Sequence, residues 1–319
     1  MSEMIRIDDL LEGDVLLYRG RSFVSRAIQF FDGTEVSHAA VYLGNHEVGE
    51  AVAKGLMRQD YGVGAKGNEW VQAHRLKDRP YDMGPVLTKA AEYLDQGNRY
   101  GFEQLLLLAF LCLTRKLKVS PSLRVLIRTV LDASASILTQ LLSEEREPMI
   151  CSEFVYRAYD EALPEMDDLY SLSVNIALPM VVRGVEVTAR PTVRGQGVHP
   201  QSLLAQLPAS DRDVRMVRAS EHEPTAVDEG EIDALIEAYL GEVRQAPSRA
   251  VEVERVVDET RAASDRFAYS LYAAYQGQPV EEVERGAAYE HLLKTAADFV
   301  TPGDLIKTQS LFLLGRIED

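Results

Sequence analysis

Short apolar runs separated by turn residues fill the first hundred residues, a pattern that predicts a strand-rich unit. The run SHAAVYL at 37–43 is apolar on both faces, as expected for a central strand. Gly44-Asn45 follows as a turn signal, so 37–43 and 47–53 form a predicted hairpin. Further strands are predicted at 15–18, 55–59 and 69–76, and helices at 22–31, with Ser22 as cap, and at 86–94.

Beyond residue 100 the apolar positions follow helical spacing. The strongly apolar segment 102–142 predicts a helical hairpin, which either packs in the core or forms a wall or lid beside a site. A helix at 148–163 follows, and the chain then shows a strand at 186–193, an acidic linker at 220–231 and helices at 231–243, 249–275 and 280–299. The end, 301–319, predicts a turn and a strand. Residues 199–217 echo it loosely, so either copy could close the sheet.

Composition narrows the class of protein. The 319 residues are 46% hydrophobic, enough for a full core in one large or two ordinary domains. A net charge of −16 argues against nucleic acid or an anionic membrane as a partner attracted by charge alone. Only two cysteines occur, and no basic or apolar leader opens the chain, so we expect a cytoplasmic location. The longest apolar run, 105–113, is shorter than the ~20 residues of a membrane span, so no transmembrane helix is expected.

Cys151 stands in the first turn of the helix predicted at 148–163. It precedes Phe154 and Val155 by three and four residues, so its thiol shares their inward face. The partial positive charge of a helix N-terminus lowers a cysteine pKa from its usual ~8.5 and favours the nucleophilic thiolate. The alternative is that Cys151 is a small buried apolar residue. Cys112 lies in the apolar run and is expected to be inert.

A nucleophilic cysteine needs a base, and six histidines are available: His38, His46, His74, His199, His222 and His291. His38 is the strongest candidate, because it begins a predicted central strand, where an imidazole is costly to bury without a partner. His74 is a weaker alternative base.

Glu50 is the candidate for orienting that base, because it is a carboxylate in the apolar run VGEAV. With a three-residue loop at 44–46, residues 40 and 50 pair, and His38 and Glu50 lie diagonally on one face. With a two-residue loop they fall on opposite faces, and the third group is then sought at Gln72 or His74. Alternatively, Glu50 is an edge carboxylate that faces water.

Taken together, these residues and motifs carry a family resemblance. GDVLLYRG, SHAAVYLG, GEAV and MICSEFVYRAYDEA, in the order His38, Glu50, Cys151, resemble the circularly permuted papain-like amidases, the permuted NlpC-type or YiiX-like branch. The resemblance implies an α+β fold in which a small antiparallel barrel or sheet packs on a cysteine-bearing helix, with large helical additions. It implies Cys151 as nucleophile, His38 as base and Glu50 as the orienting residue, and TPGDL near the end looks like the closing segment.

The same resemblance suggests a domain plan. Residues 1–165 plus 296–319 form the expected catalytic domain, with 102–142 as an inserted apolar hairpin and 166–295 as a mainly helical insertion or accessory domain. In the alternative plan the catalytic domain closes at about 199–218, and 225–319 is a separate helical domain. The apolar hairpin and the 166–295 segment depart from the family pattern and leave substrate choice open.

The leading functional hypothesis is a cysteine hydrolase that cleaves an amide in a cell-wall-derived peptide or an isopeptide through an acyl-enzyme. A lipid or thioester acyl hydrolase or acyltransferase, with lipid contact through 102–142, is the first alternative, and a non-catalytic binding protein is the second. No cofactor is expected, since no Gly-rich phosphate loop occurs. No metal site is expected either, because the histidines and cysteines lack the close paired spacing usual for zinc.

Overall fold

The computed structural model of the protein describes most of the chain. The described residues are 3–52, 55–95, 99–100, 103–117, 120–143, 147–163, 167–174, 180–182, 185–187, 199, 202–206, 229–245, 258–297 and 299–318. Predictions for most of 186–193, for 220–228 and for 249–257 fall outside these ranges.

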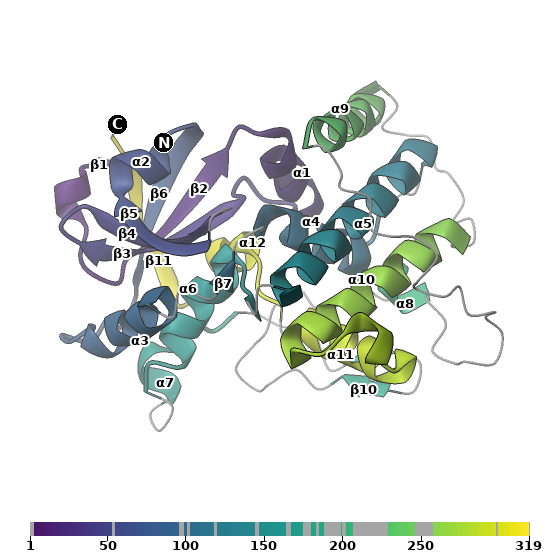
Figure 1. Ribbon diagram of the computed structural model, residues 1–319. Helices are drawn as coiled ribbons and strands as arrows, with labels where there is room; N and C mark the ends of the chain where they lie inside the picture. The colour runs from purple at the N-terminus through teal and green to yellow at the C-terminus, as the bar shows by residue number, and fades with distance from the viewer. Residues whose placement is uncertain are drawn as a thin grey trace.

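Seven strands form one sheet within the described ranges, in the order β1-β11-β6-β2-β3-β4-β5 (Figure 1). Neighbours are antiparallel except β1 and β11, so the sheet is mixed. The bounds are β1 Met4–Ile5, β2 Val15–Gly20, β3 His38–Gly44, β4 Glu47–Val52, β5 Gly55–Asp60, β6 Asn68–Leu76 and β11 Leu311–Ile317. Two-stranded pairs join β7 Arg99–Tyr100 with β8 Glu147–Pro148, and β9 Met180–Val182 with β10 Val185–Val187.

Most of the remaining described segments contain helices. They are α1 Phe23–Asp32, α2 Tyr61–Ala65, α3 Gly84–Asp95, α4 Glu103–Thr114, α5 Pro121–Ser143, α6 Cys151–Asp160, α7 Asp167–Tyr170, α8 Leu203–Gln206, α9 Glu229–Gln245, α10 Asp258–Gln276, α11 Arg285–Ala297 and α12 Pro302–Lys307. Short 3-10 helices lie at Ile7–Asp9 and Val280–Glu282. The predicted α+β class is therefore confirmed.

Local signals explain where several helices begin. The Ser22 side chain accepts a hydrogen bond from the Ser25 N–H at the start of α1, and Gly33 ends the helix in the left-handed region, as the sequence predicts. Two glycine-containing segments for which no helix was predicted contain helices. Residues 61–67, which separate the strands predicted at 55–59 and 69–76, contain α2, which Asp60 caps. TPGDL, expected as a turn, forms the capping box and first turn of α12.

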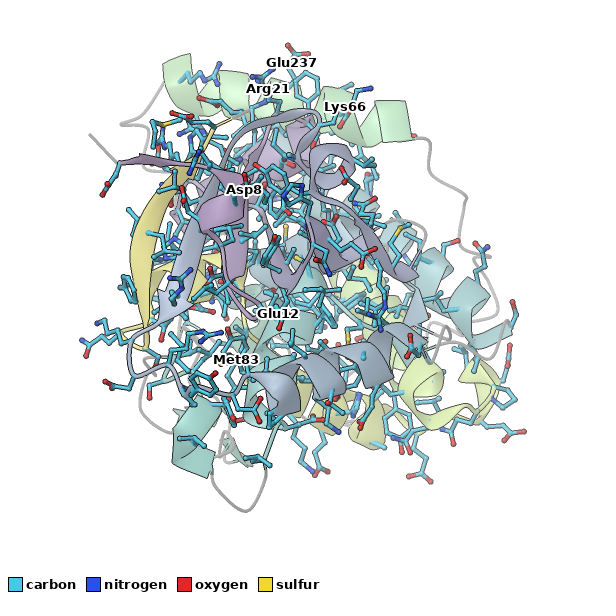
Figure 2. The ribbon with its side chains drawn as sticks, turned by 90° about the vertical axis from the view of Figure 1, so that its left-hand side faces the viewer. Asp8, Glu12, Arg21, Lys66, Met83 and Glu237 are labelled. Atoms are coloured by element: carbon cyan, nitrogen blue, oxygen red, sulfur yellow. The ribbon has the colours of Figure 1, made fainter. Side chains whose placement is uncertain are left out.

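Alternation along the strands divides the core between the two faces of the sheet. Leu17, Ala39 and Val41 pack with α3 and α6 on one face. Their neighbours on the strands, including Tyr18 and Ala40, pack on the opposite face with residues of the N-terminal segment and α2. In Figure 1, α3 and α6 lie on one side of the sheet and α2 on the other. Figure 2 shows Met83, just before α3, near the Glu12 loop that leads into β2.

The predicted hairpin 102–142 is present as α4 and α5. Residues 106–113 of α4 are all buried, within a core shared with α1, α5 and α10, so α4 packs as a core helix. Ser122–Ser143 of α5 is long and apolar enough, by length and composition, to cross a membrane, and half of its most apolar window is buried. No helix of this kind was expected from the longest uninterrupted apolar run, 105–113. In α5, serines and threonines interrupt the leucines. A buried core helix can have the same length and the same apolar composition.

The C-terminal strand enters the sheet, whereas most of the earlier echo at 199–217 lies outside the described residues. β11 pairs antiparallel with β6 and parallel with β1. The described part of the earlier copy contains the short helix α8. The two ends of the chain thus meet in one sheet, while the domain boundaries stay predictions.

Phe154 offers a test of how α6 is held against the sheet. It is fully buried, packs edge-to-face on Tyr93 of α3 and lies against Gly49 of β4. We expect Phe154→Ala to lower the free energy of unfolding by about 3–5 kcal/mol, because it removes a large core side chain. Urea denaturation measures this, with the exposed Phe312→Ala as control. A loss similar to that of the control would contradict the packing of α6 described here.

Candidate active site

The hairpin of β3 and β4 fixes the position of Glu50. Its loop has two residues, Asn45 and His46, both with positive φ, which is the geometry of a type I′ turn. A two-residue loop was expected to put Glu50 on the wrong face. However, a bulge between Tyr42 and Gly44 inserts one extra residue, so Ala40 still pairs with Glu50. The predicted register is confirmed, although the predicted loop length is wrong.

His38 and Glu50 are in direct contact as a result. His38 Nε2 lies 2.5 Å from Glu50 Oε2, and both residues are buried. Burial raises the pKa of a carboxyl group, but the hydrogen bond and positive charge of His38, with a second hydrogen bond from Gln59, outweigh it. The pKa of Glu50 is therefore lowered below its ordinary value. Glu50 is thus an ionised, buried partner of His38 and not an edge carboxylate in water.

Three neighbours that the sequence did not single out complete this cluster. Gln59 of β5 donates from Nε2 to Glu50 Oε1. The ring of Tyr18, which pairs with His38 across β2 and β3, lies edge-on to the imidazole with centroids 5.1 Å apart. Burial, and next the charge of Glu50, raise the pKa of Tyr18, so its phenol stays neutral. A Cβ at Gly64 would lie 2.6 Å from Glu50 Oε1, so the α2 backbone covers the carboxylate directly.

Cys151 lies in the first turn of α6, as predicted, although the helix begins at Cys151 itself and not at residue 148, and the side chain is fully buried. The preceding Ile150 makes no side-chain cap, so backbone N–H groups of the first helical turn are not capped by it. Ser152 Oγ donates to Val300 O at 2.8 Å, which ties this turn to the segment before α12. The setting is that of a thiol at a positive helix end, buried among the apolar side chains packed on the sheet.

The orientation of α6 relates Cys151 to His38. Tyr159, in the last turn, donates its hydroxyl hydrogen to Gly13 O, just before β2 begins. Cys151 lies ~12 Å back along the helix axis from Tyr159. By alternation, however, His38 and Glu50 point to the α2 face, whereas Cys151 packs on the α6 face. The two side chains can therefore meet only around the end of β3, and the convergence of all three stays a prediction.

The other histidines occupy different surroundings. His46 is exposed in the hairpin loop, with Nε2 2.8 Å from Asp8 Oδ1. His74 is buried on β6, and burial lowers its pKa to about 4. With Gln72, His74 lies on the α6 face of the sheet, so it stays the alternative base. His291 packs against Tyr272 and Tyr275 in the helical part, and His222 lies outside the described residues. Of His199, the backbone N–H donates to Thr114 O.

Two further features limit the chemistry. Cys112 lies buried in α4, and burial raises the pKa of its thiol to about 12, so it is a poor nucleophile. Among the residues that the structure describes, no group of three or more His, Cys, Asp or Glu side chains is placed to hold a metal ion.

Comparisons with known proteins add little. No family model matches the chain, and no curated protein matches it. Among solved structures, the chain is similar to that of the metalloprotein YiiX from Escherichia coli O157:H7, with 14% identity over 97% of this chain and 98% of that one, and a TM-score of 0.38. A TM-score this low does not establish a shared fold, so neither fold nor chemistry is inferred from it.

The lowered pKa of Glu50 predicts how stability depends on pH. A group whose pKa is lower in the folded state stabilises the protein above its unfolded pKa, and this stability is lost as pH falls through the folded value. The stability gap between wild type and Glu50→Gln should therefore be largest near pH 6 and shrink as the pH falls below about 4.5, the ordinary value.

Urea denaturation at a series of pH values from 6 to 3 measures this gap. Glu47→Gln, which changes an exposed carboxylate on the same strand, is the matched control. A wild-type to Glu50→Gln gap that stays constant over this range would contradict an ionised, His38-bound Glu50.

Proposed function

We propose that the protein is a cysteine hydrolase that cleaves an amide bond, in a peptide or an isopeptide, by way of an acyl-enzyme. Cys151 is the nucleophile, His38 the base and Glu50 the residue that orients the base. The observation that carries the proposal is the buried contact between His38 Nε2 and Glu50 Oε2. A buried carboxylate that holds one imidazole nitrogen is the arrangement that activates a nucleophile in hydrolases with a catalytic triad.

The proton transfers follow from that contact. With Nε2 of His38 held by Glu50, Nδ1 is the nitrogen that would take the Cys151 proton. The thiolate attacks the carbonyl carbon, and the backbone N–H groups at the start of α6 would donate to the resulting oxyanion. The imidazolium returns its proton to the leaving amine as the C–N bond breaks. Water, deprotonated by His38, then hydrolyses the thioester and restores the thiol.

In this proposal the architecture is the permuted papain-like one. Supporting it are the order His38, Glu50, Cys151 along the chain, the antiparallel pairing of β2, β3, β4 and β5, and the entry of the C-terminal strand into the same sheet. The cysteine-bearing helix α6 packs on β3 and β4.

The structure gives no specific support to the acyl-chain alternative. That alternative relied on the apolar run 105–113, yet residues 106–113 are buried against other helices in the core. Burying an acyl chain contributes ~0.8 kcal/mol per methylene only where apolar side chains line an open site. A peptide amide is therefore the better substrate class to test first.

Cysteine reactivity tests the proposed nucleophile and base. We expect iodoacetamide at pH 6–7 to alkylate Cys151 faster than Cys112, because a helix end and an imidazolium stabilise the thiolate. His38→Ala should slow the reaction by roughly tenfold or more, since lowering the thiol pKa by one unit raises the thiolate fraction about tenfold. Peptide mass spectrometry measures both cysteines in the same sample.

Two histidine variants serve as controls for His38→Ala. His46→Ala removes an exposed imidazole from the same hairpin and should leave the rate unchanged. His74→Ala removes the alternative base. Equal alkylation of Cys151 and Cys112, or a loss of reactivity in His74→Ala instead of His38→Ala, would overturn the assignment.

Turnover separates the substrate classes. A short peptide amide is compared with acyl thioesters of rising chain length in wild type, Cys151→Ala and the matched Cys112→Ala. We expect amide turnover that Cys151→Ala abolishes and Cys112→Ala retains, with no steep dependence on acyl length. A rate that climbs with chain length would favour the lipid alternative, and no Cys151-dependent turnover of either class would favour a binding protein.

A further inference from the structure

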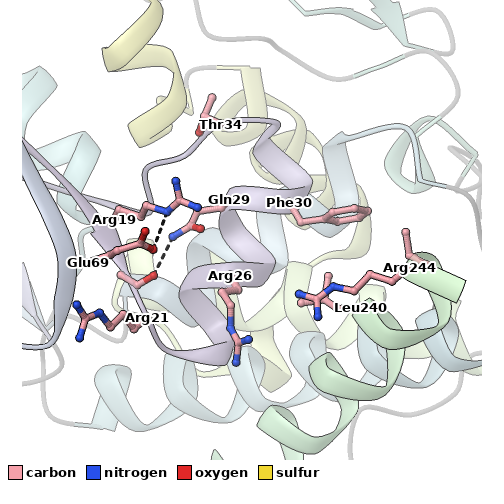
Figure 3. Close-up of a pocket in the computed structure, with 11 residues that line it drawn as sticks. Arg19, Arg21, Arg26, Gln29, Phe30, Thr34, Glu69, Leu240 and Arg244 are labelled. Carbon is pink, nitrogen blue, oxygen red and sulfur yellow. Dashed lines mark hydrogen bonds and ion pairs between the residues drawn. The ribbon is translucent and has the colours of Figure 1, made fainter. Parts of the chain in front are cut away.

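A second site is built where β2 leads into α1. A cavity of about 620 Å³ opens there between α1 and α9, within the volume range of small-molecule sites (Figure 3). Its walls come from β2, α1, β6 and α9, which are far apart in the sequence. The lining residues are Arg19, Gly20, Arg21, Arg26, Gln29, Phe30, Thr34, Glu69, Leu240, Val243 and Arg244. None of Cys151, His38 and Glu50 is among them.

The charge of this cavity is opposite to that of the chain. Four arginines line it against one carboxylate, Glu69, in a protein with 50 acidic and 34 basic residues. Figure 2 shows Arg21 at the edge of the molecule where α9 lies, with Glu237 of α9 labelled nearby. Glu237 does not line the cavity. Guanidinium groups gathered on concave walls focus a positive potential that attracts anions.

Only one of the four arginines is neutralised. Arg19 contacts Glu35 and Glu69, the latter at 3.0 Å between Nε and Oε2. For Arg21, Arg26 and Arg244, no carboxylate of the described chain lies within ion-pair distance. Three positive charges are thus available to a ligand.

Arg26 is the most enclosed of these three arginines, being partly buried where Arg21 and Arg244 are exposed. Its Nε is buried and has no hydrogen-bond acceptor among the described residues, and its guanidinium carbon lies 4.2 Å from the centroid of the Phe23 ring. An oxygen supplied by a ligand would give this N–H the acceptor that the described residues do not provide. In Figure 3, Arg244 extends from α9 toward α1.

The other lining residues include apolar side chains and Gln29, whose side chain is already hydrogen-bonded. Phe30, Leu240 and Val243 give the cavity an apolar side. Gln29 donates to Gly20 O at 3.0 Å, which holds the wall where β2 ends. The ligand that fits has a compact group with several negative charges and an apolar or flat organic part.

We propose that this cavity binds a small phosphate-bearing organic anion, with phosphates held by Arg21, Arg26 and Arg244 and the organic part against Phe30 and Leu240. The planar guanidinium fork suits bidentate contact with phosphate oxygens. The net charge of −16 opposes an anionic polymer or membrane as the source of the phosphates. The site is independent of the proposed hydrolase chemistry.

Calorimetric titration of the full-length protein tests the site. The probes are adenosine triphosphate, inorganic tripolyphosphate, citrate and vesicles containing phosphatidylserine. We expect adenosine triphosphate to bind more tightly than tripolyphosphate because its ring meets the apolar wall, and both to weaken as salt rises. Arg26→Gln combined with Arg244→Gln should weaken adenosine triphosphate binding by about tenfold or more.

The control combines Arg6→Gln with Arg58→Gln, which removes the same charge from exposed ion pairs elsewhere. Arg21→Gln, a change at an exposed side chain, tests the site if the double variant does not fold. The proposal would be overturned by no binding of either phosphate probe at millimolar concentration, by equal weakening in the control, by citrate binding as tightly as tripolyphosphate, or by binding to vesicles alone.

Discussion

The buried pair of His38 and Glu50 is the interaction on which the candidate site depends. Two ionisable groups are held at 2.5 Å in the interior, where a charge without a partner is strongly unfavourable. Removing one member of such a pair typically costs about 3–5 kcal/mol, because the other is left buried and unpaired. The Glu50 carboxylate also accepts a hydrogen bond from Gln59 and lies against the α2 backbone at Gly64. The groups in direct contact with it are therefore polar.

That pair exists because of a small backbone irregularity. Asn45 and His46 form a tight turn that would pair β3 and β4 in the wrong register for a shared face. The bulge before Gly44 adds one residue and restores the face, since side-chain direction reverses with every residue of a strand. The site therefore rests on the geometry of a turn several residues from the side chains that it places.

The second cavity lies where the end of β2 and α1 border α9 of the helical part. α1 packs on α4 and α9, so its outer face borders α9 where β2 ends. The arginines there come from β2, α1 and α9, and only Arg19 is paired with carboxylates of the described chain. The proposed catalytic residues and the arginine cavity thus lie on different surfaces at the same end of the sheet.

The sequence by itself determined the elements whose signals are local. The Ser22 cap, the strands of the hairpin and the helix that carries Cys151 in its first turn all follow from neighbouring residues. The pairing of Ala40 with Glu50 was also predicted, although through a different turn. Only the tertiary structure decided that Gln59 and Gly64 contact Glu50, that β11 pairs with both β6 and β1, and that arginines from three elements line one cavity. These arrangements depend on contacts between residues far apart in the chain, which local patterns of hydrophobicity and turn residues do not encode.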